Sequence, residues 1–138
     1  MKTLTQFIAQ SNISAKLIRS VVRQIGGWQS FKESANDVYN NGATCGFSGF
    51  TWYSDTEKFT KNNKKEIIEL LKNESDEMGY NMTELLTSFR CFKGMSEHEI
   101  LNGLYNPLSE DKTTVYNGMA WYALEEVARD YCGLTESN

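Results

Sequence analysis

Apolar positions recur every three or four residues along most of this chain, which is the spacing of amphipathic helices. The clearest example lies between residues 111 and 132, where one stripe contains Tyr116, Ala120, Ala123, Leu124, Val127, Ala128 and Tyr131. Three members of the stripe are alanines, and their small side chains let a partner helix approach closely. We therefore expect this longest helix, ended by Gly133, to lie at the centre of a helical bundle with Leu124 and Val127 buried.

Capping signals divide the rest of the chain into shorter helices. Ser14 begins a helix with a stripe from Leu17 to Ile25, and Gly26 and Gly27 end it. Other helices are expected from Thr3 to about 10, over about 28–39, from Ser54, from 64 to Met78, from Asn81 or Thr83 to Gly94, and from Ser96 to about 105. Capping boxes are expected at Ser54–Glu57 and Ser96–Glu99, and a break between helices at Asn62-Asn63. Buried positions of these helices are expected to include Trp28, Phe31, Ala35, Val38, Phe59, Met82, Leu85, Leu86 and Phe89.

These patterns predict an all-α fold, a compact bundle of about seven helices that forms a single domain over residues 1–138. One insert departs from the pattern. Residues 42–54 contain three glycines and four aromatic residues and no charge, and a short strand is possible there, because Thr51-Trp52-Tyr53 favours extended backbone. Two interpretations stay open for the aromatics Phe47, Phe50, Trp52 and Tyr53. They either plug one end of the bundle, or they form a binding loop beside Asp55.

The distribution of charge adds a second candidate surface. The net charge is −4, but residues 1–32 contain five basic residues and no acidic one. Four of the five, Lys16, Arg19, Arg23 and Lys32, lie on the two helices that follow Ser14. Such a basic face is either a solvated surface or a patch for nucleic acid or an acidic protein.

The residues that usually carry catalysis or bind metals show no supporting arrangement. The lone histidine, His98, falls in the first turn of a helix, and Cys45, Cys91 and Cys132 have no metal-binding spacing and fit reduced thiols. Adjacent carboxylates such as Glu125-Glu126 and Asp76-Glu77 diverge by about 100° on a helix. We therefore predict no catalytic residue, no metal, no cofactor and no enzymatic activity.

Localisation follows from hydropathy. No apolar run approaches the roughly 20 residues that a membrane-spanning helix needs, and the N-terminus lacks the apolar core of a signal peptide. We expect a cytoplasmic protein that does not contact a membrane.

The motif GATCGFSGFTWYSDT at the insert resembles a family of small proteins carried by phages, plasmids and other mobile elements of gut and related bacteria. The similarity extends to the N-terminal pattern around NISAK, QIGGW, Ser34, Ala35 and Asp37, and to AWYALEEVARDY over 120–131. The resemblance implies an accessory protein that acts in a bacterial host cell by stoichiometric binding, and inhibitors of CRISPR nucleases are a prominent class of such proteins. It implies no catalytic residue.

Two functions follow as hypotheses. In the first, the protein is a non-enzymatic inhibitor that binds a host protein, such as a CRISPR or other defence nuclease, through Phe47, Phe50, Trp52, Tyr53 and Asp55. In the second, Lys16, Arg19, Arg23 and Lys32 bind nucleic acid, with the helices over 14–25 and 28–39 arranged as a helix-turn-helix. The sequence pI near 5.0 disfavours the second hypothesis. The identity of the partner and the oligomeric state are left open.

Overall fold

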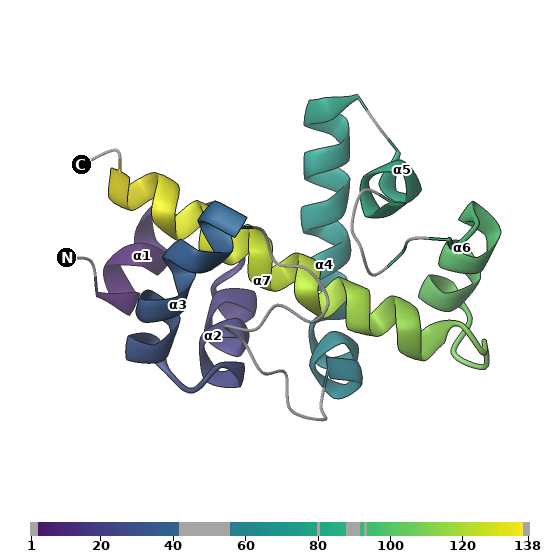
Figure 1. Cartoon of the computed structure of the whole chain (residues 1–138), viewed down its shortest axis with the longest axis horizontal. Coiled ribbons are helices and arrows are strands. Elements are labelled where there is room, and N and C mark those ends of the chain that lie inside the picture. Colours follow the sequence, from purple (N-terminus) through teal and green to yellow (C-terminus); the bar gives the residue numbers. More distant parts are fainter. Residues whose placement is uncertain (1–2, 42–55, 80, 88–91, 93, 137–138) are drawn as a thin grey trace.

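The computed structural model describes residues 3–41, 56–79, 81–87, 92 and 94–136, which form seven α-helices and no strand (Figure 1). The all-α bundle that the sequence predicts is confirmed. The helices are α1 (Leu4–Gln10), α2 (Ala15–Gln24), α3 (Trp28–Asn41), α4 (Thr56–Met78), α5 (Met82–Thr87), α6 (Glu97–Tyr105) and α7 (Lys112–Glu136).

Helix α7 is the central element. It runs across the whole molecule and packs against α1, α2, α3, α4 and α6 (Figure 1). Its residues from 118 to 125 are all buried, so this segment has neighbours on every side. Among the helices of the described part of the chain, none is long and apolar enough to cross a lipid bilayer.

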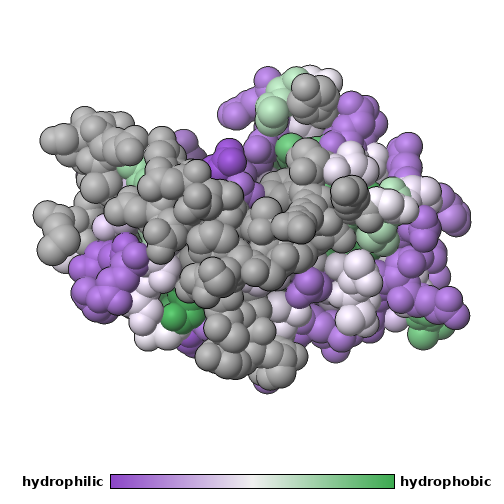
Figure 2. Space-filling model, in the orientation of Figure 1, coloured by the Kyte–Doolittle hydropathy of each residue, from purple (hydrophilic) through white to green (hydrophobic). Residues whose placement is uncertain are grey.

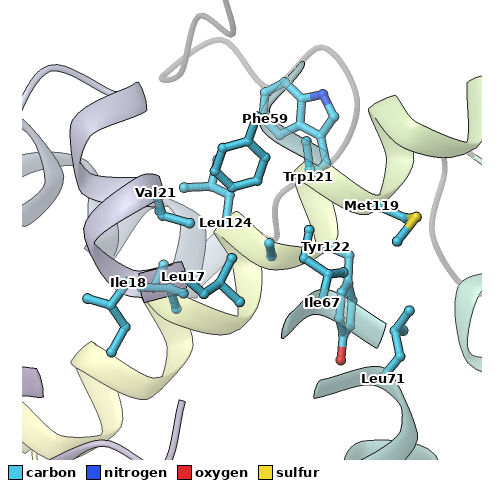
Figure 3. Packing of buried hydrophobic residues seen from close by; sticks show 14 of the residues in the cluster. Leu17, Ile18, Val21, Phe59, Ile67, Leu71, Met119, Trp121, Tyr122 and Leu124 are labelled. Atoms are coloured by element: carbon cyan, nitrogen blue, oxygen red, sulfur yellow. The ribbon is translucent and has the colours of Figure 1, made fainter. Parts of the chain in front are cut away.

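The core forms where α2 and α4 meet α7. Figure 3 shows side chains from the three helices converging on one another, and all of those labelled are buried: Leu17, Ile18, Val21, Phe59, Ile67, Leu71, Met119, Trp121, Tyr122 and Leu124. Leu124 and Val127 are fully buried, as the apolar stripe predicts. An aromatic part of the same core joins α1 and α3 to the last third of α7. It contains Phe7, Trp28, Phe31 and Tyr131, whose ring centroids lie 5.3 to 6.3 Å apart.

The helix ends follow the capping signals of the sequence. Thr3 and Ser96 each accept a hydrogen bond from the third residue of their helix in a complete capping box. After α2, Gly26 and Gly27 adopt φ values of 103° and 111°, and their amides donate to the carbonyls of Arg23 and Val22. This is the Schellman arrangement, which needs a positive φ directly after the helix and therefore favours glycine.

Three expected helix boundaries are wrong. Helix α5 ends at Thr87 and does not reach the expected stop at Gly94. The break at Asn62-Asn63 is absent, because α4 is one continuous helix from Thr56 to Met78. The buried Asn63 amide donates to the Phe59 carbonyl at 2.9 Å, so it supports the helix instead of competing with it. Helix α7 also continues past Gly133 to Glu136, since Gly133 does not adopt a positive φ.

Other expectations concern the segment after α4. Asn81, not Thr83, caps α5, because its side-chain oxygen accepts from the Glu84 amide at 2.9 Å. Phe92 provides a buried aromatic side chain after this helix. The insert 42–54, Ser54, Phe89 and the side chain of Val38 lie outside the described residues.

The two interior glycines of α7 provide a matched test of this packing. A Cβ atom at Gly118 would lie 2.3 Å from the ring of Phe92, which is itself buried, whereas a Cβ at Gly133 would have no neighbour within 4 Å. Alanine is the better helix former by about 1 kcal/mol. We expect Gly133→Ala to be neutral or to stabilise by up to that amount, and Gly118→Ala to destabilise by about 1–3 kcal/mol through overpacking. Urea unfolding of both variants measures the difference, and equal stabilities would mean that Phe92 does not pack on Gly118.

Candidate functional site

A basic groove of about 580 Å³ lies between α2 and the first half of α4. Helix α2 contributes Lys16, Arg19 and Arg23 to its wall, and helix α4 contributes Lys58. The remaining lining residues are polar or aromatic: Ser20, Gln24, Phe59, Asn62 and Asn63. The groove lining that the structure describes contains no acidic side chain.

The spacing of the cations on α2 places them in this groove. Lys16, Arg19 and Arg23 are three and four residues apart, so they share one face of the helix. The buried stripe that begins at Leu17 and Ile18 fixes the opposite face on the core. The cations are therefore held outward by the same packing that anchors the helix.

Among the described residues, a carboxylate pairs with one cation of the groove and with none of the others. The Lys16 ammonium lies 3.2 Å from a Glu66 carboxylate oxygen and donates to the Asn62 carbonyl at 2.7 Å. Burial acts to raise the pKa of Glu66, but hydrogen bonds from the backbone and from Lys16 outweigh it and hold that pKa below its ordinary value. Arg19, Arg23 and Lys58 are exposed, and no described carboxylate pairs with them. The groove can therefore bind an anionic group.

The structure brings together three of the four basic residues singled out from the sequence and adds a fourth. Lys32 does not line the groove, because its ammonium lies over the Trp28 ring of α3 at 5.9 Å from the centroid. Lys58 was missed by the sequence analysis. The signal that could have marked it is the run of Lys58, Lys61 and Lys64, which follow one another at three-residue intervals on one helix.

The aromatic candidates Phe47, Phe50, Trp52 and Tyr53 and the neighbouring Asp55 all lie outside the described residues. The described chain resumes directly after Asp55. Helix α4 begins at Thr56, and Lys58 and Phe59 of its first turn line the basic groove. The chain therefore leads directly from the insert into one wall of the groove.

An acidic cleft of about 640 Å³ lies between the second half of α4, the second half of α7 and the segment that joins α1 to α2. Carboxylates dominate its lining: Glu74, Asp76, Glu77, Glu126 and Asp130. Ile13 and Leu70 add apolar surface, and Arg129 is the only cation of the described lining. The Ser11 hydroxyl donates to Asp130 and so ties the start of this segment to α7.

Two carboxylic residues that line this cleft, Glu74 and Glu126, meet beside the buried Tyr122. The buried Tyr122 hydroxyl donates to Glu74 at 2.5 Å, and the Glu126 carboxyl is also hydrogen-bonded to Glu74. Burial, with the nearby charges of Glu74 and Glu125, raises the pKa of Glu126 to about 8, although Arg129 acts in the opposite direction. Burial and the charge of Glu126 also raise the pKa of Tyr122. At neutral pH the Glu126 carboxyl therefore keeps its proton.

The sequence did not reveal this pair. Neighbours such as Glu125 and Glu126 do diverge, as expected, with Glu125 buried against Arg129 at 2.9 Å. Glu74 and Glu126 lie 52 positions apart and meet only because α4 crosses α7. Within the described part of the chain, no group of three or more His, Cys, Asp and Glu side chains is arranged to hold a metal ion. His98 is exposed at its helix start, and Cys132 is buried.

Helix α4 carries both the basic and the acidic surface. Residues 56–65 contain four lysines and one acid, whereas residues 66–78 contain five acids and one lysine. Asp76 and Glu77 fall in the last turn, where the helix dipole disfavours negative charge by about 0.3–1 kcal/mol each. The segregation of charge therefore does not serve the stability of the helix itself.

A family model described as a domain of unknown function (DUF7222) matches residues 9–137. No curated protein and no solved structure matches the chain significantly.

The carboxyl pair makes stability depend on pH. The folded chain keeps a proton on Glu126 up to about pH 8, whereas an unfolded glutamate releases it near its ordinary pKa of 4.5. Because the folded chain binds this proton more tightly than the unfolded chain, the protonated Glu126 stabilises the fold. This stabilisation is complete below about pH 4.5 and is lost as the pH rises through about 8. Glu126→Gln keeps a hydrogen-bonding group that cannot ionise.

We expect Glu126→Gln to match the wild type at pH 5 and to melt several degrees higher at pH 8, since 1 kcal/mol corresponds to roughly 4 °C in a domain of this size. Thermal unfolding at the two pH values measures this, with the exposed Glu110→Gln as the control. A Glu126→Gln variant with the wild-type pH profile would contradict the raised pKa of Glu126.

Proposed function

We propose that this chain, which belongs to the family described as a domain of unknown function (DUF7222), is a non-enzymatic accessory protein that acts by stoichiometric binding to a host protein. The proposed class of partner is a defence nuclease of a bacterial host, such as a CRISPR nuclease, which the protein would inhibit inside the cell. The resemblance to phage and plasmid proteins supports this context. The proposal requires no cofactor and no metal.

The observation that supports a binding role is the basic groove. Arg19, Arg23 and Lys58 gather along one open face without a described carboxylate partner. Like charges held close together repel one another, and an acidic surface of a partner would relieve that repulsion. Arginine is also enriched at protein interfaces, where its planar group forms paired hydrogen bonds with carboxylates.

The aromatic insert supplies the apolar part of the proposed interface. Binding energy at protein interfaces is concentrated in a few aromatic and arginine side chains. Phe47, Phe50, Trp52 and Tyr53 precede the groove wall directly in the chain, with Asp55 as the last residue before α4. We propose that one partner surface contacts both the insert and the groove.

Nucleic acid is the second candidate ligand, favoured by the same row of cations. Phosphates bind arginine and lysine as carboxylates do. The charge of the rest of the molecule disfavours nucleic acid as the ligand. A long duplex would be repelled by the net charge of −4 and by the acidic second half of α4. A protein partner can place its acidic residues opposite the groove alone.

The protein-binding proposal is tested by reversing the charge of the groove. Tagged protein is used to capture its partner from a lysate of a bacterial host, and the captured nuclease is then titrated with purified protein. We expect inhibition to be complete near one chain per nuclease, and the double variant Arg19→Glu, Arg23→Glu to bind at least 10-fold more weakly, because opposed like charges at an interface cost several kcal/mol. Lys72→Glu, an exposed change outside the groove, is the control. Unchanged binding by the double variant would exclude the groove.

The contribution of the insert is measured in the same titration. Trp52→Ala and Tyr53→Ala should weaken binding while the melting temperature stays close to that of the wild type. A core aromatic behaves differently, since its truncation costs about 3–5 kcal/mol of stability. Early melting of Phe47→Ala, Phe50→Ala, Trp52→Ala and Tyr53→Ala alike would show that the insert is a plug and leave the groove as the binding surface.

The dependence of binding on salt concentration distinguishes nucleic-acid binding from protein binding. We expect no appreciable binding to duplex DNA near physiological ionic strength. If the groove bound phosphates, affinity would fall steeply with salt, and each of Lys16→Ala, Arg19→Ala and Arg23→Ala would reduce the slope of log K against log salt by about 1. A tight and salt-sensitive duplex complex, measured by fluorescence anisotropy, would reverse the order of the two candidates.

A further inference from the structure

The wall of the basic groove contains a buried polar atom whose hydrogen bonding is incomplete. Asn63 of α4 is 2% exposed and lines the groove. Its amide nitrogen donates to the Phe59 carbonyl, so the side-chain oxygen is left as an acceptor, and it has no hydrogen-bond partner among the described residues. A buried acceptor without a partner destabilises a protein, and most such atoms in native structures are paired. A ligand in the groove that donates a hydrogen bond would satisfy this oxygen.

Positive charge lies in the same groove. Arg19 and Arg23 are one turn apart on α2, and Lys58 precedes Asn63 by five residues on α4, about 7.5 Å along the helix. These three cations are exposed and have no described carboxylate partner, whereas Lys16 is already paired. Three cations suit a group of high negative charge. A phosphate monoester carries about −1.5 to −2 at pH 7 on three acceptor oxygens, and arginine can bind two of them at once.

The size and polarity of the groove call for more than a phosphate ion. Its volume of about 580 Å³ falls in the range of pockets that bind small organic molecules. Besides the cations and Phe59, its described lining consists of uncharged side chains that form hydrogen bonds: Ser20, Gln24, Asn62 and Asn63. Such a lining suits a carbon skeleton that carries hydroxyl groups.

Aromatic and apolar ligands fit this groove poorly. A nucleobase binds by stacking on an accessible aromatic face. Phe59, the aromatic residue of the described lining, is only 5% exposed and lies in the core with Trp121 and Leu124 (Figure 3). The wider surface is polar too, since Figure 2 shows the apolar residues of the described surface as small, scattered patches among hydrophilic ones. We therefore expect a hydrophilic ligand without an aromatic ring.

We propose that the basic groove binds a small phosphorylated sugar or polyol. The phosphate lies among Arg19, Arg23 and Lys58, and a hydroxyl group of the ligand donates to the Asn63 oxygen. Because it involves the same groove, this site rests on the binding role proposed for the groove, but not on the identity of the partner protein. A bound sugar phosphate occupies the cations that an acidic partner needs, so it competes with the partner and regulates its binding.

A ligand series titrated into the purified chain and followed by NMR tests the chemistry of the site. We expect ribose 5-phosphate and glycerol 3-phosphate to bind with dissociation constants on the order of 0.1 mM. Inorganic phosphate, which lacks the carbon skeleton, should bind about 10-fold more weakly, and ribose, which lacks the phosphate, should not bind measurably. Binding of neither sugar nor polyol phosphate overturns the proposal. Inorganic phosphate that binds as tightly as ribose 5-phosphate also overturns it, because the groove is then a plain anion site.

Adenosine 5′-monophosphate distinguishes a sugar phosphate from a nucleotide, since it contains the same ribose phosphate with a base attached. We expect it to bind no more tightly than ribose 5-phosphate, because the groove offers no accessible aromatic face to the base. Tighter binding of the nucleotide would overturn the assignment to a sugar phosphate.

Charge-removing substitutions locate the site. Arg19→Gln and Arg23→Gln should each lower the affinity for ribose 5-phosphate about 10-fold, because each removes a hydrogen bond between charged groups. Lys65→Gln makes the same change of charge at an exposed position of α4 that does not line the groove, and is the matched control. Equal losses in the three variants would attribute binding to overall charge and overturn the groove as the site.

The role of Asn63 is tested by combining a variant with the choice of ligand. Asn63→Ala should lower the affinity for ribose 5-phosphate about 3- to 10-fold, the loss expected for one hydrogen bond. The affinity for ethyl phosphate, which has no hydroxyl group to donate, should stay unchanged, and this also shows that the variant is folded. If Asn63→Ala does not fold, the wild type decides alone. Equal affinities of the wild type for ethyl phosphate and ribose 5-phosphate overturn the proposal.

The titrations need no partner protein, so their outcome is independent of the nuclease proposed above. Absence of sugar-phosphate binding, with partner binding still lost in Arg19→Glu, Arg23→Glu, overturns the sugar-phosphate site alone. Failure to capture a partner leaves the titrations unaffected. Where both ligands bind, ribose 5-phosphate at about 10 times its dissociation constant should weaken partner binding about 10-fold, as competition for one site requires. Simultaneous binding without competition would overturn the shared site.

Discussion

Burial of α7 on every side is the constraint on which the rest of the structure depends. Because positions 118 to 125 are all inside, five other helices must surround this one. Small residues make that possible, since Gly118 admits the ring of Phe92 and the alanines of the stripe admit neighbouring helices closely. Even Glu125 lies inside, and the guanidinium of Arg129 one turn later compensates its charge.

Packing around α7 also determines where charge can lie. Helix α4 crosses α7 and gives its buried face to the core, so its lysines and carboxylates remain at the surface in the order of the sequence. The first half of α4 then lies beside the cations of α2, and the second half lies beside the carboxylates of α7. A molecule with net charge −4 thereby acquires a basic region and an acidic region, which suit different contacts.

The two regions differ in how their charges are compensated. The basic groove leaves Arg19 and Arg23 exposed and available to a partner, and this supports a role in binding. The acidic cleft reduces part of its own charge, because Glu126 keeps its proton at neutral pH and Tyr122 donates a hydrogen bond to Glu74. The cleft therefore contributes to the packing of α4 on α7 as well as to the surface.

The sequence by itself predicted the all-α fold, the caps at Thr3, Ser14 and Ser96 and the glycine stop after α2, because these depend on residues a few positions apart. It also placed Lys16, Arg19 and Arg23 on one outward face of α2. Only the tertiary structure decided that Lys58 joins them, that Lys32 lies over Trp28 instead, and that Glu74 meets Glu126. Lys32 and Trp28 are four positions apart on one helix. The other contacts join residues up to 52 positions apart on different helices, so they depend on how α2, α4 and α7 cross. The continuity of α4 through Asn62-Asn63 was likewise settled in three dimensions, because the Asn63 amide bonds within the helix and Lys16, from another helix, binds the Asn62 carbonyl.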